Sequence, residues 1–139
     1  MEELERWRIE RACRALVDDF ARALDFSDQD HFLELFTRDA ELDYGGVHEG
    51  LEAIARFVGT RPRETRTRHV MSNHWIEIID DSTARGLAYC SLYAGGAGAG
   101  DEAPVPAAVG HVQDRFRHGD DGWRFERRAF HWSFGAPPG

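Results

Sequence analysis

The sequence predicts an α+β domain in which helices from the first part of the chain pack on a curved, mostly antiparallel sheet. Two observations predict this class. Apolar residues recur at intervals of three and four in most of residues 4–58, which is typical of helices with one buried face. From residue 69 onward the pattern alternates with a period of two, which is typical of strands. With 139 residues, the chain is expected to form a single domain over residues 1–139.

The first element is expected to be a helix of about six turns that begins near Leu4 and ends near Leu24. Its apolar positions fall on one face, and they are Ile9, Ala12, Cys13, Leu16, Val17, Phe20, Ala21 and Leu24. Ser27 and Asp28 offer an N-cap for a second helix. That helix would carry Phe32, Leu33, Leu35 and Phe36, and we expect it to end at Thr37.

The middle of the chain predicts a short strand over residues 40–44, which the pair Gly45 and Gly46 would end. A third helix is expected over residues 51–58, because Leu51, Ile54, Ala55 and Val58 share one face.

Four strands follow, over residues 69–79, 83–93, 109–117 and 122–134, and the links at 80–82 and 118–122 resemble hairpin turns. Residues 94–108 carry little side-chain bulk, so we expect a mobile hairpin loop there, with a lid over a pocket as the alternative. A curved sheet over helices leaves a cavity of the kind that binds small molecules.

The charge composition excludes several classes of function. Asp and Glu number 25 against 17 for Lys and Arg, which gives a net charge of −8, and all 17 cations are arginine. Without lysine there can be no Schiff-base lysine, pyridoxal-phosphate attachment or Walker-type phosphate loop. The acidic balance argues against a nucleic-acid partner. The sequence has no apolar run long enough to span a membrane and no secretory leader at its start, so we expect a cytoplasmic protein.

No metal or cofactor is expected. Cys13 and Cys90 are far apart and lie in apolar patterns, so we interpret them as reduced core thiols. The sequence contains neither a CxxC nor an HExxH motif.

Asp25 and His69 are the first candidates for chemistry. Asp25 sits at the boundary of an apolar helix face, and His69 begins an apolar strand. Each has a structural alternative, because Asp25 could cap the next element and His69 could be an ordinary core residue. If both face the cavity, the carboxylate can hold one ring N–H while the other nitrogen acts as a base near neutral pH.

The other candidates depend on strand parity or on packing. Tyr44 could project into the mouth of the cavity or pack as a core aromatic residue. Asn73 could bind substrate or bridge to the backbone, and the alternation places it with His69 and Trp75. Arg128 could face inward and neutralise Asp25 or a developing oxyanion. His111 joins the cavity only if the odd-numbered face of its strand points inward.

Four segments carry a family resemblance: ARALDFSDQDHFLELFTRDAELDYGGVHEGLEAI, RHVMSNHWIEIIDDSTARGLAYCSLY, GHVQDRF and DGWRFERR. They are similar to the SnoaL-like branch of the NTF2-like superfamily, and the resemblance covers roughly residues 8–132. It implies a cone of helices and curved sheet around a cavity. The branch includes scytalone dehydratase, steroid isomerases and dehydratases, a dehydrochlorinase, polyketide cyclases and small subunits of ring-hydroxylating dioxygenases.

The resemblance also implies roles for particular residues. Asp25 and His69 fall on the positions of the Asp and His that several lyases of this branch pair. Tyr44 resembles the tyrosine with which scytalone dehydratase helps to polarise its substrate, and Arg128 falls where some eliminating relatives keep an inward arginine. Phe20 stands where other relatives hold a tyrosine or lysine.

These inferences predict a cofactor-independent lyase or isomerase that acts on a small hydrophobic, aromatic or polycyclic substrate. Asp25, His69, Tyr44 and Arg128 would be catalytic. The residues expected to bind substrate are Phe20, Asn73, Trp75, Tyr89, His111 and Trp132. The alternative is a non-catalytic ligand-binding or assembly subunit that resembles the small subunit of ring-hydroxylating dioxygenases, and a polyketide-type cyclase is a third reading.

A homodimer or homotrimer is expected, because the outer face of the sheet would otherwise expose apolar residues. The residues assigned to that face are Leu87 or Ala88, Val112 and Phe125.

Overall fold

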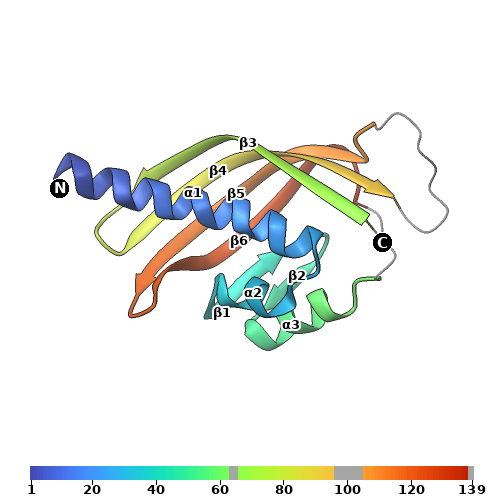
Figure 1. The fold of residues 1–139 in the computed structure, drawn as a ribbon, viewed down its shortest axis with the longest axis horizontal. Helices are drawn as coiled ribbons and strands as arrows, with labels where there is room; N and C mark the ends of the chain where they lie inside the picture. The colour runs from blue at the N-terminus through green and yellow to red at the C-terminus, as the bar shows by residue number, and fades with distance from the viewer. Residues whose placement is uncertain (63–65, 96–104, 138–139) are drawn as a thin grey trace.

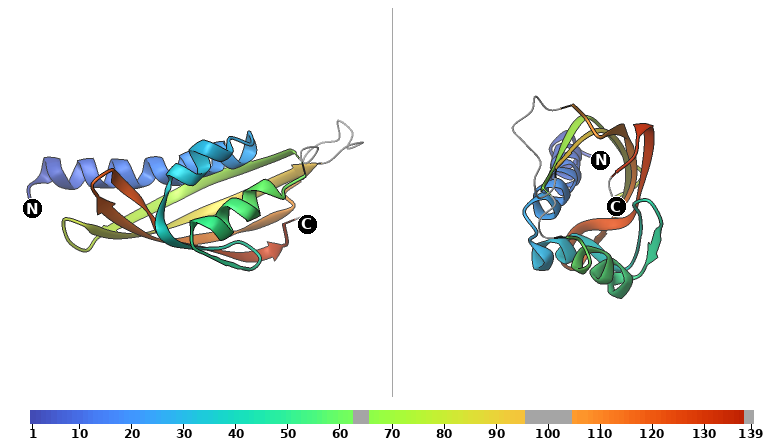
Figure 2. Two further views of the ribbon diagram at one scale, coloured as in Figure 1. Left: turned by 90° about the horizontal axis from the view of Figure 1, so that it is seen from below. Right: turned by 90° about the vertical axis from the view of Figure 1, so that its right-hand side faces the viewer.

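The opening helix lies along the concave side of a strongly curved six-stranded sheet (Figures 1 and 2). The computed structural model describes residues 1–62, 66–95 and 105–137. Residues 96–104, which make up most of the loop expected as a possible lid, lie outside the described residues.

Helix α1 spans Glu3–Asp25, as its apolar periodicity predicts. Its buried face consists of Ile9, Cys13, Leu16, Val17, Phe20, Ala21, Ala23 and Leu24. The first two turns extend beyond the sheet, and Leu4 and Trp7 are exposed there (Figure 1). After the helix, Ser27 adopts a φ of 56°, which turns the chain sharply.

Helix α2 spans Gln29–Glu34 and is shorter than expected. The carboxylate of Asp28 caps it by accepting a hydrogen bond of 3.2 Å from the backbone N–H of His31. The expectation that Phe36 belongs to this helix is wrong, because Phe36 begins strand β1 (Phe36–Asp43) and pairs with Phe125. Thr37 therefore lies inside a strand, and it does not mark the end of a helix.

Strand β2 (Val47–Glu49) was not expected from the sequence. It pairs antiparallel with the end of β1, in the register Glu41 to Glu49. Helix α3 spans Leu51–Gly59, close to the expected bounds, and buries Ile54 and Val58.

The four later strands are β3 (Arg66–Ile78), β4 (Thr83–Gly95), β5 (Ala108–Gly119) and β6 (Gly122–Gly135). The order across the sheet is β2-β1-β6-β5-β4-β3. All neighbours are antiparallel except β1 and β6, which are parallel. The predicted fold class is therefore confirmed: helices cover one face of a curved, mostly antiparallel sheet.

A β-bulge bends β3 in its middle. The register with β4 shifts between Ser72 and Trp75, and Asn73 takes a left-handed φ of 54°. Just past the bulge, Gly86 pairs with Ile76 and allows a close approach, since a Cβ there would lie 3.1 Å from the backbone oxygen of Trp75 and 3.0 Å from the Phe116 ring. Bulges of this kind increase the local twist and help the sheet to wrap around α1.

The sheet has a core face and an outer face, and burial alternates along each strand accordingly. Ala88, Val112 and Phe125 are buried on the core face, so assigning them to an outer, oligomer-forming surface was wrong. Leu87 does lie on the outer face, because it alternates with Ala88 and pairs with Trp75.

Candidate active site

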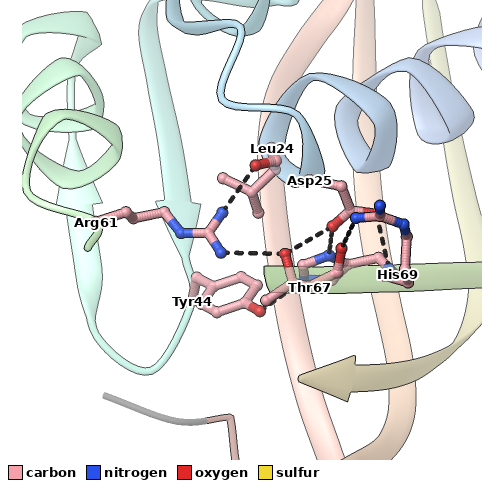
Figure 3. Close-up of polar contacts among 7 residues, drawn as sticks. Leu24, Asp25, Tyr44, Arg61, Thr67 and His69 are labelled. Atoms are coloured by element: carbon pink, nitrogen blue, oxygen red, sulfur yellow. Dashed lines mark hydrogen bonds and ion pairs between the residues drawn. The ribbon is translucent and has the colours of Figure 1, made fainter. Parts of the chain in front are cut away.

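The C-terminal end of α1 brings Asp25 against the start of β3, where its carboxylate accepts three hydrogen bonds (Figure 3). One oxygen, Oδ1, accepts from the ring Nδ1–H of His69 at 2.6 Å and from the Thr67 hydroxyl at 2.8 Å. The other, Oδ2, accepts from the backbone N–H of His69 at 2.9 Å. The carboxylate is therefore fixed in position and orientation.

The ring of His69 is fully buried and lies between Asp25 and Tyr44. A carboxylate can only accept, so Nδ1 carries a proton, and in the neutral ring Nε2 is then the unprotonated nitrogen. The hydroxyl of Tyr44, just beyond the end of β1, lies 2.8 Å from Nε2 and donates to it. The three residues thus form one chain in which Tyr44 donates to His69 and His69 donates to Asp25.

Burial alone would raise the pKa of Asp25, but the bonds from the ring and backbone of His69 and from Thr67 outweigh it and hold the pKa below its usual value. Asp25 is therefore a carboxylate at neutral pH.

Tyr44 packs among aromatic rings. Its ring lies 4.7 Å from that of Phe130, 5.6 Å from that of Phe57 and 6.0 Å from that of Trp132. Burial raises the pKa of the phenol well above its usual value, although the nearby charge of Arg61 opposes this. Tyr44 therefore stays protonated and acts as a hydrogen-bond donor.

Arg61, which follows α3, reaches the same network from the other side (Figure 3). Its guanidinium donates to the backbone oxygen of Leu24 at 3.2 Å and to the Thr67 hydroxyl at 3.3 Å. Neither Arg61 nor Thr67 was predicted as a site residue. The alternation of β3 did carry a signal for Thr67, which lies two residues before His69 and so on the same face, but the arginine-rich segment of residues 61–68 gave none that singled out Arg61.

Arg128 is buried in the core and bound to another acid. Its guanidinium donates to both carboxylate oxygens of Asp114, at 2.8 and 3.2 Å, and lies 4.4 Å from the ring centroids of Phe20 and Phe125. The expectation that Arg128 could neutralise Asp25 is therefore wrong, because Asp114 already balances its charge. Its Nη1 is buried with no hydrogen-bond partner among the described residues.

Trp132 lies on the same strand face as Arg128 and stacks against Phe130, with ring centroids 5.6 Å apart. Its Nε1 is the other buried side-chain polar atom that has no partner in the described part of the chain. Phe20 is fully buried. The ring of Phe130 packs against both Phe20 and Tyr44 and so lies between them.

Four residues that were expected to bind substrate do not join this cluster. Trp75 and Tyr89 are about half exposed on the outer face, and His111 stacks there on His131 with the ring centroids 4.9 Å apart. Asn73 forms the exposed bulge of β3. The bulge resets the alternation, so Trp75 points away from the face that carries His69.

The described residues contain no group of three or more His, Cys, Asp or Glu side chains that could hold a metal ion. Within those residues, too, no helix is long and apolar enough to cross a membrane. The thiol of Cys90 is buried on the core face, and burial raises its pKa to about 12, so it is not a nucleophile near neutral pH.

The fold and the site together define a class of protein. Its members have N-terminal helices on the concave face of a curved sheet, and here that architecture encloses the hydrogen-bonded side chains of Asp25 and His69. The chain belongs to the SnoaL-like domain family, whose model matches residues 5–129. No curated protein sequence matches the chain.

Several solved structures share this fold. A putative scytalone dehydratase from Novosphingobium aromaticivorans is 20% identical, with a TM-score of 0.81 over 99% of this chain and 97% of its own. The hexachlorocyclohexane dehydrochlorinase LinA, type 2, is 16% identical, with a TM-score of 0.81 over 99% of both chains. An NTF2-like protein with a cystatin-like fold, also from N. aromaticivorans, is 19% identical, with a TM-score of 0.79 over 94% of this chain and 86% of its own. At these identities the likeness shows the fold, and the predicted NTF2-like architecture is confirmed.

Proposed function

We propose that this protein is a lyase or isomerase that removes a proton from a small hydrophobic substrate, with His69 as the general base. The observation that carries the proposal is the hydrogen bond of 2.6 Å between His69 Nδ1 and Asp25, made by a ring with no exposed surface. A structural histidine needs no buried carboxylate to fix its tautomer. A catalytic base does, because Asp25 leaves Nε2 unprotonated and stabilises the imidazolium that forms.

In this structure, the Tyr44 hydroxyl is hydrogen-bonded to His69 Nε2. A substrate that binds between the two groups takes the place of this bond, so that its carbon-bound proton faces Nε2 and one of its oxygens accepts from Tyr44. The raised pKa of Tyr44 suits it to this role as a donor. The aromatic rings around it favour an apolar, aromatic or polycyclic substrate.

The proposed elimination has four linked changes. His69 Nε2 takes the proton from carbon, and the C–H electron pair forms the new double bond. The carbon–oxygen bond breaks, and the departing hydroxyl receives the proton from the imidazolium and leaves as water. In an isomerisation, the proton returns to a different carbon.

Arg128 Nη1 and Trp132 Nε1 are buried donors that find no hydrogen-bond partner within residues 1–62, 66–95 and 105–137, and they support a substrate that carries oxygen acceptors. Buried N–H groups without a partner are costly, and a carbonyl oxygen of the substrate would satisfy them. Two neighbours in fold are named as a dehydratase and a dehydrochlorinase, terms that both denote eliminations.

Proton transfer can be measured before the natural substrate is known. Bicyclic aromatic ketones in D2O report α-proton exchange by NMR, and the matching β-hydroxy ketones report loss of water by ultraviolet absorption. We expect His69→Ala to reduce either rate by ~10²- to 10⁴-fold, the range of general-base catalysis, and Asp25→Asn to reduce it in the same sense. His131→Ala is the matched control, because this histidine is exposed on the outer face. Full activity in His69→Ala, with circular dichroism confirming that each variant is folded, would refute the assignment.

The non-catalytic alternative accounts less well for the site. An assembly or ligand-binding subunit requires no buried Asp25–His69 hydrogen bond, and this structure has one. A polyketide-type cyclase would use the same acid–base groups, and a substrate panel would separate it from an elimination.

A further inference from the structure

Arg61 enters the site network from outside the Asp25–His69 pair. It follows α3, and its side chain is partly buried between the last turn of α1 and the start of β3 (Figure 3). One terminal nitrogen binds the Leu24 carbonyl at 3.2 Å, next to Asp25 in the sequence, and the other binds the Thr67 hydroxyl at 3.3 Å.

The direction of each bond follows from chemistry. A guanidinium has only donors, so the Thr67 oxygen accepts from Arg61 and its own hydrogen goes to Asp25 Oδ1 at 2.8 Å. Arg61 contacts the Thr67 oxygen and leaves its hydrogen for Asp25. Arg61 therefore helps to hold the Thr67 oxygen in the position from which it donates to Asp25.

The contact with Leu24 acts on the backbone. The Leu24 carbonyl lies in the last turn of α1, where helix carbonyls carry partial negative charge, and it also accepts a hydrogen bond of 3.3 Å from the backbone N–H of Ser27. A cation bound there holds the end of the helix, and with it Asp25, against β3.

The other arginines near this network have different partners. Arg128 is bound to Asp114, and the Arg68 guanidinium lies 4.6 Å from the ring centroid of Phe26 while donating to the Thr67 backbone oxygen. In the described part of the chain, Arg61 is thus the arginine whose guanidinium donates to the Thr67 hydroxyl, which in turn donates to Asp25.

We propose that Arg61 is a positioning residue for the Asp25–His69 pair, acting through the Thr67 hydroxyl and the Leu24 carbonyl. Its effect on turnover rests on the proposed function, whereas its effect on the pair itself does not. Burial lowers the pKa of Arg61, and the nearby Tyr44 and Asp25 oppose that shift. The Arg61 guanidinium is therefore close enough to interact electrostatically with both site residues.

The first readout needs no substrate. The ring ¹⁵N chemical shifts of His69, assigned by their loss in His69→Ala, report how much of the ring has its proton on Nδ1. In Arg61→Gln we expect the Nδ1–H population to fall, because Asp25 is held less firmly in the position where it accepts the hydrogen bond from Nδ1–H. Arg56→Gln is the matched control, an exposed arginine of α3, and it should leave the His69 signals unchanged.

The second readout is turnover on the ketone probes. We expect kcat to fall about 10- to 100-fold in Arg61→Gln, as misplacement of a catalytic group does. Thr67→Val removes the hydroxyl and keeps the arginine. Because Arg61 acts in part through Thr67, the double variant should lose less activity than the two single losses combined.

The outcomes separate this proposal from the proposed function. Unchanged His69 shifts and unchanged kcat in Arg61→Gln would overturn the role of Arg61, even if His69→Ala is inactive. Effects of Arg61→Gln and Thr67→Val that simply add would overturn the part of the proposal in which Arg61 acts through Thr67. A shifted tautomer in Arg61→Gln, in a protein that turns over no ketone probe, would support the positioning role while the proposed function fails.

Discussion

Asp25 occupies a position that is electrostatically unfavourable for a carboxylate. It is the last residue of α1, where the helix dipole is negative and basic side chains are the usual occupants. Three hydrogen bonds from Thr67 and His69 compensate for this placement. An acid held against the local field by a dedicated set of donors is typical of a functional residue.

These bonds predict a pH dependence of stability. The pKa of Asp25 is lower in the folded protein than in the unfolded chain, so its charged form stabilises the fold. This contribution is present above the unfolded pKa of about 4 and is lost as the pH falls through the folded value. In urea titrations, the free energy of unfolding of the wild type should therefore exceed that of Asp25→Asn at pH 7 and 5. This difference should shrink at pH 3. A difference that stays constant across this range would contradict the prediction.

The residues with chemically distinctive side chains could be predicted as site candidates from the sequence. Asp25, His69 and Tyr44 each interrupt an apolar pattern or end an element, and the structure brings all three together. Arg61 could not be predicted, because it belongs to a polar turn whose arginines look alike in sequence. Only the tertiary structure, which brings the residue after α3 to the Leu24 carbonyl, selects one of them.

At the scale of elements, the bulge of β3 explains the errors in parity. An extra residue at Asn73 moves every later side chain of the strand to the opposite face, so a strict period of two assigned Trp75 to the same face as His69. Nothing in the residue types marks this bulge. The early start of β1 could not be predicted from residue types either. Thr37, Arg38 and Asp39 are polar, and only their place in the sheet makes them part of a strand.

Strands β5 and β6 are joined by the buried ion pair between Asp114 and Arg128, whose Cα atoms are direct partners in the register. Removing one member leaves an unpaired buried charge, which costs about 3–5 kcal/mol. We expect Arg128→Met to lower the free energy of unfolding by this amount in urea titrations.

Replacing both members of the pair, as Arg128→Met with Asp114→Leu, should cost less than the sum of the two single changes. If Arg128→Met were as stable as wild type, the ion pair between Asp114 and Arg128 would make no contribution to the stability of the fold.

For the whole molecule, the outer face of the sheet is the surface to be explained. Val70, Trp75 and Tyr89 lie on β3 and β4 and are each about half exposed. Apolar and aromatic side chains gathered on one sheet face are typical of an interface. We therefore predict a homodimer or homotrimer that associates through this face.

Light scattering coupled to size-exclusion chromatography tests the assembly. Trp75→Glu combined with Tyr89→Glu should reduce the mass to that of one chain, 15.8 kDa. Leu4→Glu, an exposed apolar position on the first turn of α1, should leave the mass unchanged. A wild-type protein that is already a monomer would contradict the prediction.

The position of β6 also has a consequence for the order of folding. This strand comes last among the described elements, yet it lies in the middle of the sheet, between β1 and β5. While a ribosome is still adding residues 122–135, the earlier strands can form two separate pieces, β1 with β2 and β3 with β4 and β5. Because β6 is the strand that hydrogen-bonds these two pieces of the sheet together, the Tyr44 side of the site meets the His69 side late in synthesis. A nascent chain that stops before Gly122 should therefore bury neither set of residues fully and should be open to proteases.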